Sequence, residues 1–400
     1  MKRFINKIAG AFGIQITRKK FNKHTDGFIT LKPKGVSNGN VLLAYIIDPF
    51  LLGPGEKIPN SHTHFWESSQ IAKTFLDLGY TVDVISYRNS KFIPEKKYAF
   101  FVSARTNFQR IAELLNKDCI KIANLDMAHW TTNNYAAYQR CFNLHKRRKA
   151  VIKNYKLQDE NYAIEYADYG TVLGNEFTLD TYRYAGKPLF RIPLPTCLSF
   201  PLFEDKNYKN SKNNFLWFGS GGLVHKGLDL VLEAFTLMPE FNLIVCGPID
   251  WEKDFQEVYF KELYQTANIK TVGWVDIESK EFEAILKKCN AVVFPSCAEG
   301  GGGSVITCMQ GGLIPIVSYE ASIDVQDEYG VILKYSSVEE IKNAVRYVAG
   351  LSEDTLKQMA TKSRSFAAMN HSKNAFKKRH RDVIETIIEL EEKKRHTKID

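Results

Sequence analysis

Residues 295–315, PSCAEGGGGSVITCMQGGLIP, form the stretch that decides the fold, and they follow the apolar run AVVF at 291–294. A short apolar run that stops at Pro and Ser is typical of a buried strand. Ser304 is the predicted N-cap of a short helix over 305–310, and LIPIV at 313–317 predicts the next strand. The order strand, glycine-rich loop, helix, strand favours a parallel α/β sheet. A plain glycine-rich turn is the alternative, because a lone glycine motif is a weak signal.

Glu299 and the four glycines Gly300–Gly303 give this loop its predicted chemistry. Glycines at a helix start let the backbone approach a ligand, and the free N–H groups and the helix dipole favour an anion. A bound phosphate would repel a neighbouring carboxylate, so we expect Glu299 to face hydroxyl groups. An anion together with hydroxyl groups indicates a sugar nucleotide.

A second glycine-rich loop, GSGGLVHKG at 219–227, follows a predicted strand at 215–218. Lys226 stands at a helix start, where the dipole disfavours a cation, so a bound diphosphate would account for it. His225 could add a hydrogen bond to that diphosphate. A surface lysine is the alternative. Two such loops in one domain fit a nucleotide that lies across the carboxyl ends of the strands.

The chain divides into two predicted α/β domains, which a polar, proline-containing linker at 193–214 separates. Residues 1–205 form the first domain, and its apolar run VLLAYII at 41–47 is typical of a strand buried on both faces of a parallel sheet. Residues 206–372 form the second domain with both glycine loops, and 373–400 are a predicted C-terminal helix and tail. A length of 400 residues suits two domains of about 100–200 residues each.

The composition indicates a globular protein with an ample core, because 44% of the residues are hydrophobic and 25% are charged. The net charge of +9 suits phosphorylated ligands or an anionic surface. Seven cysteines without CxxC spacing favour reduced thiols in a cytoplasmic protein and argue against zinc.

No apolar run reaches the length of about 20 residues that a membrane span needs. Residues 1–25 are basic and amphipathic, which is compatible with an interfacial helix on the anionic inner face of the cell membrane. Packing of this terminus on the protein itself is the alternative. Basic clusters at 145–149 and 377–381 lie on predicted helices, so we expect solvated or lipid-facing charge there and no nucleic-acid partner.

Three motifs together resemble a known family: GSGGLVHKGLDLVLEAF from residue 219, VGWV at 272–275, and FPSCAEGGGGSVITCMQGGLIPIVS from residue 294. They resemble the retaining glycosyltransferases of the GT-B fold, the family 4 or glycosyl transferases group 1 type. The resemblance is strong over about 215–335 and weak in the N-terminal half. It implies two Rossmann-like domains facing across a cleft, with the C-terminal helix returning to the N-terminal domain.

The resemblance also implies roles for residues of the C-terminal half. Glu299 would contact the donor sugar and Lys226 the leaving diphosphate. The family's second glutamate, which holds the ribose, falls on Thr307, and its usual arginine is replaced by Ser220 and Gly221. The positions assigned to nucleotide binding are Gly219, Ser220, Gly221, Gly222, His225, Trp274, Gly301, Gly302, Gly303, Ser304, Val305 and Thr307.

In the N-terminal half the resemblance assigns fewer residues. His129, which follows a predicted strand, is the candidate histidine near the transferred sugar, and a capped loop histidine is the alternative. Ser61, His62, Thr63 and His64 take the place of the family's first loop and are assigned to the acceptor side.

The implied activity is transfer of a sugar from a UDP- or GDP-sugar to a glycan or lipid-linked acceptor, in cell-surface polysaccharide or lipopolysaccharide synthesis. The family implies retention of configuration, by front-side attack of the acceptor hydroxyl. No carboxylate pair stands out as a metal site, so we expect no metal and no other cofactor. Two alternatives are a GT-B sugar-nucleotide epimerase and a catalytically weakened nucleotide- or glycan-binding subunit, which Thr307 and Ser220 motivate.

Overall fold

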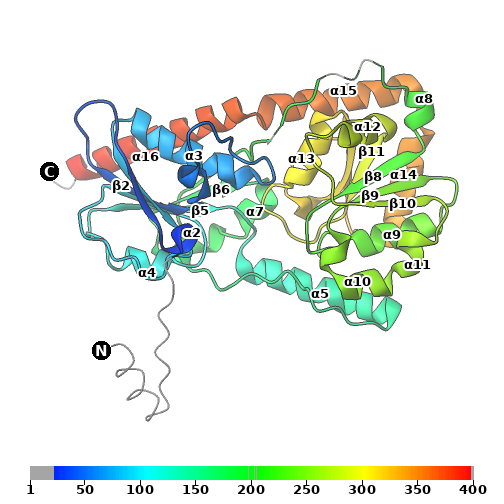
Figure 1. Ribbon diagram of the computed structural model, residues 1–400, viewed down its shortest axis with the longest axis horizontal. Coiled ribbons are helices and arrows are strands. Elements are labelled where there is room, and N and C mark those ends of the chain that lie inside the picture. Colours follow the sequence, from blue (N-terminus) through cyan, green and yellow to red (C-terminus); the bar gives the residue numbers. More distant parts are fainter. Residues whose placement is uncertain (1–21, 197, 202, 204, 398–400) are drawn as a thin grey trace, which may run out of the picture.

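The computed structural model describes residues 22–397 except 197, 202 and 204, and these residues form two α/β domains, each built on one sheet (Figure 1). The expected interfacial helix within 1–25 lies almost wholly outside the described residues. Among the described residues, no helix combines the length and apolarity needed to cross a bilayer.

The N-terminal sheet has the strand order β1-β3-β2-β4-β5-β6-β7, and all its strands are parallel except β1, which pairs antiparallel with β3. The central strands are buried on both faces because helices cover the sheet on each side, which is why they read as continuous apolar runs. The strands are β1 (Phe28–Leu31), β2 (Asn40–Tyr45), β3 (Thr81–Ser86), β4 (Phe100–Ser103), β5 (Ile120–Leu125), β6 (Tyr169–Leu173) and β7 (Leu189–Ile192). The helices are α2 (Lys23–Asp26), η1 (Asp48–Leu51), α3 (Thr63–Asp77), α4 (Phe108–Ala112), α5 (Trp130–Arg148), α6 (Ala163–Tyr166), α7 (Glu176–Asp180) and η2 (Arg183–Ala185).

The C-terminal sheet is parallel throughout, with the order β10-β9-β8-β11-β12-β13. Its strands are β8 (Asn214–Phe218), β9 (Asn242–Cys246), β10 (Ile269–Gly273), β11 (Ala291–Phe294), β12 (Ile314–Ser318) and β13 (Val331–Leu333). Its helices are α8 (Tyr208–Ser211), α9 (Leu228–Thr236), η3 (Ile249–Trp251), α10 (Lys253–Val258), α11 (Phe260–Tyr264), α12 (Lys280–Lys288), α13 (Gly303–Gln310), η4 (Tyr319–Ala321), α14 (Val338–Gly350) and α15 (Glu353–Asn370). The strand order reverses between β8 and β11, so the loops after these two strands diverge to opposite sides and leave a crevice between them.

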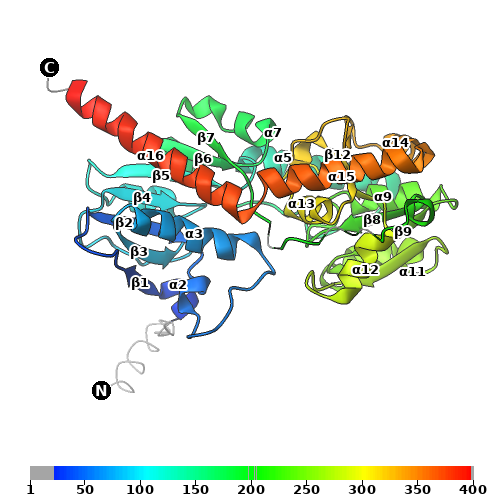
Figure 2. The same ribbon diagram turned by 90° about the horizontal axis from the view of Figure 1, so that it is seen from above.

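The last helix, α16 (Lys373–Thr397), leaves the C-terminal domain and lies along the N-terminal one (Figures 1 and 2). His380 Nδ1 lies 3.2 Å from Thr74 Oγ1 in α3, and the hydroxyl of Tyr169 donates to Glu391 at 2.6 Å. The expected return of the C-terminal helix to the first domain is therefore confirmed.

Helix α5 makes the opposite crossing, because it starts in the N-terminal domain and ends against α9, α10 and α11 of the C-terminal domain (Figure 1). Leu144 and Ile152, near and beyond its end, are buried in the same apolar cluster as Val231 and Phe255. The sequence predicts this helix over 134–149 but shows no sign that it leaves its own domain.

The predicted N-cap of α13 is wrong. The helix begins at Gly303 with Gly302 as its N-cap, and Ser304 lies inside the first turn. Gly302 adopts a left-handed conformation (φ 54°), and a Cβ at that position would collide with the side chain of Ile323. The cap is thus set by a tight loop that only glycine fits, whereas the sequence rule looks for a side-chain acceptor.

Candidate functional site

The two glycine-rich loops meet at the switch point between β8 and β11, as their positions in the strand order require. The backbone amide of Cys297 donates to the carbonyl of His225 at 2.9 Å. The indole of Trp217, buried beneath the loop 219–227, donates to the carbonyl of Lys226 at 3.3 Å. These bonds fix the relative position of the loops and set Lys226 beside Glu299.

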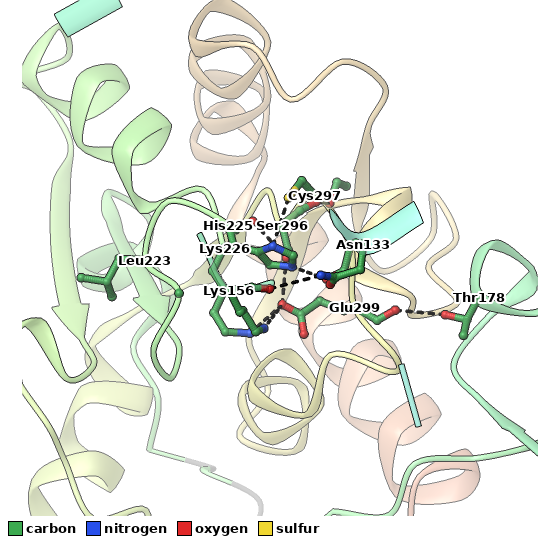
Figure 3. Close-up of polar contacts among 12 residues, drawn as sticks. Asn133, Lys156, Thr178, Leu223, His225, Lys226, Ser296, Cys297 and Glu299 are labelled. Atoms are coloured by element: carbon green, nitrogen blue, oxygen red, sulfur yellow. Dashed lines mark hydrogen bonds and ion pairs between the residues drawn. The ribbon is translucent and has the colours of Figure 1, made fainter. Parts of the chain in front are cut away.

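Lys226 and Glu299 form a buried ion pair, with Nζ 2.6 Å from Oε1 (Figure 3). Only 4% of Lys226 and 8% of Glu299 is exposed. Ser296 Oγ donates to the same carboxylate oxygen at 2.8 Å. Burial alone would raise the pKa of Glu299, but the ammonium groups of Lys156 and Lys226 outweigh burial and hold it well below its usual range. The two residues that the sequence singled out are therefore brought together.

Lys156 is a second cation at this carboxylate, and no sequence pattern indicated it. Its Nζ lies 3.5 Å from Glu299 Oε1, and its side chain is 22% exposed. It comes from the segment after α5, in the N-terminal half of the chain, and its side chain points towards Glu299 (Figure 3). Burial lowers the pKa of Lys156 to about 8, although the charge of Glu299 opposes this shift.

His225 is held within the protein and does not offer a free nitrogen. Its Nε2 lies 2.5 Å from the carbonyl oxygen of Ala298, so Nε2 carries the proton, and Nδ1 lies 3.4 Å from the thiol of Cys297. Burial, followed by the charge of Lys156, lowers the pKa of His225 to about 3. The imidazole is therefore neutral, and its position orders the loop 296–299.

The glycine-rich loop 219–227 also donates hydrogen bonds to a buried carboxylate of its own domain. The amides of Gly222 and Leu223 donate to Glu252 at 2.5 and 3.2 Å. The amide of Gly222, a position assigned to nucleotide binding, is thus bonded to a buried side chain of the same domain. Trp274, expected near the base, is 56% exposed and stacks on Trp251 with ring centroids 5.6 Å apart.

The start of α13 is crowded by the N-terminal domain. A Cβ on Gly300 would overlap the carbonyl of Asp126, and one on Gly301 would lie 3.1 Å from Leu194. The amide of Val305 donates to Gly302 O at 2.9 Å, and the hydroxyl of Thr307 donates to Gly303 O at 2.8 Å. The glycine run therefore allows close contact between the two domains, in addition to any contact with a ligand. The hydroxyl of Thr307 is hydrogen-bonded within its own helix.

The backbone of Glu299 is anchored from both domains. Its amide donates to the carbonyl of Glu320 at 2.9 Å, and its carbonyl accepts from Thr178 Oγ1 at 3.1 Å. Thr178 in turn bonds Ser322. An N-terminal-domain hydroxyl thus helps to hold the carboxylate in place, a contact that no local sequence pattern reveals.

The facing side of the N-terminal domain holds a buried cluster of ionisable groups at its own switch point, between β2 and β4. Arg105 pairs with Asp126 at 2.9 Å, and His64 Nδ1 lies 3.5 Å from the same carboxylate. Burial and the charge of Asp126 raise the pKa of Glu67 to about 8. His62 caps α3 through the amide of His64 at 3.2 Å.

Of the acceptor-side assignments, Ser61 and His62 are exposed, Thr63 starts α3, and His64 is buried. A cavity of about 390 Å³ lies nearby, and Arg88, Arg105, Asp126, Trp130 and Asp159 contribute to its wall.

His129 occupies the N-cap of α5, where its ring accepts from the amide of Thr131. Its Nε2 lies 3.0 Å from the hydroxyl of Tyr184, and burial lowers its pKa. Both ring nitrogens therefore have partners in the N-terminal domain. This geometry fits the capping alternative, and a role next to the sugar stays a prediction.

Residues 200–366 match the family model of the glycosyl transferases group 1, so the C-terminal domain is a group 1 domain of the GT-B type. The uncharacterized glycosyltransferase YqgM of Bacillus subtilis (strain 168) is 27% identical over 212 residues, which are 49% of this chain and 56% of that protein. The match thus spans little more than half of the relative's length.

Solved structures with the same two-domain architecture confirm the predicted GT-B fold. The sucrose-phosphate synthase of Thermosynechococcus elongatus gives a TM-score of 0.61 at 13% identity, covering 88% of this chain and 99% of its own. Anabaena Alr3699/HepE, in complex with UDP and glucose, gives a TM-score of 0.56 at 12% identity. The match covers 87% of this chain and 99% of the Anabaena chain. WaaG, a glycosyltransferase involved in lipopolysaccharide biosynthesis, gives a TM-score of 0.51 at 14% identity. The match covers 86% of this chain and 99% of WaaG.

Proposed function

We propose that this protein transfers a sugar from a nucleotide-sugar donor, a UDP- or GDP-sugar, to a glycan or lipid-linked acceptor. The observation that carries the proposal is the buried pair of Lys226 and Glu299, 2.6 Å apart, at the switch point of a group 1 domain. A cation at this place suits a diphosphate, and a carboxylate next to it suits the hydroxyl groups of a sugar.

In this proposal Lys226 stabilises the charge that develops on the leaving diphosphate, and Glu299 orients the donor sugar. Retention, front-side attack and independence of metal ions belong to the proposal as well. The acceptor approaches from the N-terminal domain, past His129, His62 and the cavity next to Arg105.

The acceptor class is proposed from the neighbours in fold. WaaG is involved in lipopolysaccharide biosynthesis, and HepE forms a complex with UDP and glucose. We infer a related role in cell-surface polysaccharide or lipopolysaccharide synthesis, on the cytoplasmic side of the membrane. The net charge of +9 suits an anionic membrane surface as the place of work.

The test measures nucleotide release from UDP-glucose, UDP-N-acetylglucosamine and GDP-mannose, with and without a membrane lipid extract as acceptor source. Wild-type protein should release UDP or GDP faster with the extract, and EDTA should leave the rate unchanged. Glu299→Gln and Lys226→Met should each lower the rate by about 10²- to 10³-fold. Glu328→Gln, an exposed carboxylate elsewhere in the same domain, is the matched control and should keep it.

Two other outcomes would replace the proposal. Interconversion of one nucleotide sugar into another without acceptor would identify an epimerase. Tight nucleotide binding without turnover on any acceptor would identify a binding subunit, for which the commitment of the Thr307 hydroxyl to Gly303 O is the motivating observation.

A further inference from the structure

The segment 149–158 brings N-terminal-half residues into the donor site. Helix α5 reaches the C-terminal domain, where Arg147 pairs with Asp229 at 2.5 Å and Arg148 pairs with Glu262 at 2.6 Å. The chain then turns back, and the amide of Lys153 donates to Asp254 at 2.5 Å. This return segment therefore runs over the surface of the C-terminal domain towards the glycine loops.

The end of the return segment is fastened to the start of α5. Asn133 Nδ2 donates to the carbonyl of Lys156 at 3.2 Å, and Asn134 Nδ2 donates to the carbonyl of Gln158 at 2.9 Å. The Gln158 amide donates back to Asn134 Oδ1 at 2.8 Å. Lys156 itself has φ 52°, a left-handed conformation that is unfavourable for a residue other than glycine. The fold thus holds one lysine in an unfavourable backbone conformation at the edge of the site.

The absence of a side chain at Gly222 leaves room for the side chain of Lys156 to reach the site. The aliphatic stem of Lys156 crosses Gly222, where a Cβ would lie only 2.5 Å from Lys156 Cδ. A glycine at 222 therefore makes room for this lysine. The stem ends with Nζ near Glu299, which already has Lys226 as its closer partner.

The charges at this point do not balance. Glu299 carries one negative charge against the two ammonium groups of Lys156 and Lys226. His225 is neutral, and the nearby carboxylate of Glu252 is occupied by the amides of Gly222 and Leu223. An additional anion would complete the pairing. The place of the family's arginine is taken by Ser220 and Gly221, which supply no cation.

We propose that Lys156 is the second cation for the donor's diphosphate and contacts the phosphate that carries the sugar, because its Nζ lies beside the carboxylate assigned to that sugar. This inference rests on the proposed function. It means that the N-terminal half of the chain supplies part of the phosphate site of the C-terminal domain, and that Lys156 compensates for the missing arginine.

The test compares full-length wild type with Lys156→Met, Lys156→Arg and Lys153→Met by titration calorimetry. The probes are UDP and GDP, each paired with its monophosphate. Methionine keeps the stem over Gly222 and removes the charge, while Lys153, exposed on the same segment, controls for loss of a lysine. Lys156→Met should weaken binding of the nucleoside diphosphates by about 10- to 100-fold, as the loss of one charge-assisted hydrogen bond predicts. The same substitution should weaken binding of the monophosphates much less. Lys156→Arg and Lys153→Met should keep the affinity for the diphosphates within about threefold of wild type.

The outcomes distinguish the role of Lys156 from the existence of the donor site. Unchanged diphosphate affinity in Lys156→Met, or equal weakening of mono- and diphosphate, would overturn the role of Lys156 while wild-type binding still supports the donor site. Failure of the wild type to bind any of the four nucleotides would overturn the donor site itself, and this inference with it.

Discussion

Gly300 lies so close to the carbonyl of Asp126 that no side chain fits between them. The contact joins the glycine loop of the C-terminal domain to the end of β5 in the N-terminal domain. The two domains are therefore in direct contact next to Glu299 and to the buried cluster around Asp126.

Substitution of Gly300 by alanine should wedge the domains apart. The added methyl group has no flexible side chain to displace, because its neighbours are backbone atoms of Asp126 and Met127. We expect a larger radius of gyration in small-angle scattering and a loss of about 10²-fold in kcat/KM for sugar transfer, since small displacements of reacting groups have such effects. Gly350→Ala, where nothing lies within 4 Å of the new Cβ, is the control. Wild-type dimensions and activity in Gly300→Ala would contradict this account of the glycine run.

Much of the fold was predictable because its strands are buried on both faces and read as uninterrupted apolar runs. The predicted strand at 291–294 coincides with β11, and those predicted at 41–47, 215–218 and 313–317 match β2, β8 and β12 to within two residues at each end. The antiparallel edge strand β1 was missed, since its alternating half-exposed residues carry a weak apolar signal.

The site was predictable only where a loop carries its own signature. Lys226 and Glu299 stand in glycine loops and were found, whereas Lys156, Thr178 and Glu252 stand in stretches without a motif. Their roles arise from tertiary contacts across 30 to 143 positions, between elements that the sequence alone does not place together. The left-handed conformation of Lys156 has no sequence sign either, since glycine or asparagine would be expected there.

Glu299→Gln should destabilise the protein more than Lys226→Met. Loss of the carboxylate leaves two facing ammonium groups, whereas loss of Lys226 leaves Glu299 with Lys156 and the Ser296 hydroxyl. Removing one partner of a buried pair costs about 3–5 kcal/mol, and we expect Glu299→Gln to approach that range. Melting temperatures of both variants measure the order. Added inorganic pyrophosphate should restore more of the lost melting temperature in Glu299→Gln than in Lys226→Met. If Lys226→Met were the less stable variant, Lys156 would not contribute to the ion pair.

Glu67 should make the stability of the N-terminal domain depend on pH. Its folded-state pKa of about 8 lies above the ordinary value of 4.5, so the folded protein holds a proton that the unfolded chain releases. Its stabilising contribution is complete below pH 4.5 and is lost as the pH rises through 8, with a slope of about 1.4 kcal/mol for each pH step of one between these values. The melting temperature should therefore fall between about pH 5 and pH 9, and that of Glu67→Gln should fall less steeply. Parallel curves for both proteins would refute the raised pKa of Glu67.

His129 should reveal its role through two substitutions. Asparagine can still accept from the amide of Thr131 as an N-cap, whereas alanine cannot, so alanine should cost about 1 kcal/mol more. If His129 only caps α5, His129→Asn should retain transfer activity within a fewfold of wild type, which is the result that its two ring partners favour. A loss of about 10²-fold or more in kcat with an unchanged melting temperature would instead support proton transfer or sugar contact by the imidazole.

The two crossings of the chain between domains have a consequence for engineering. A chimaera joined within the predicted linker 193–214 would take the proposed donor domain without the return segment that delivers Lys156. It would also expose the apolar surface of the C-terminal domain on which Leu144 and Ile152 pack, and it would leave Asp229 without its ion pair to Arg147. A transplantable donor module must therefore be discontinuous, with residues 130–158 carried along with the C-terminal domain. Transferring the C-terminal domain with its packed partner helix thus requires two further junctions, near residues 130 and 158, besides the one in the linker.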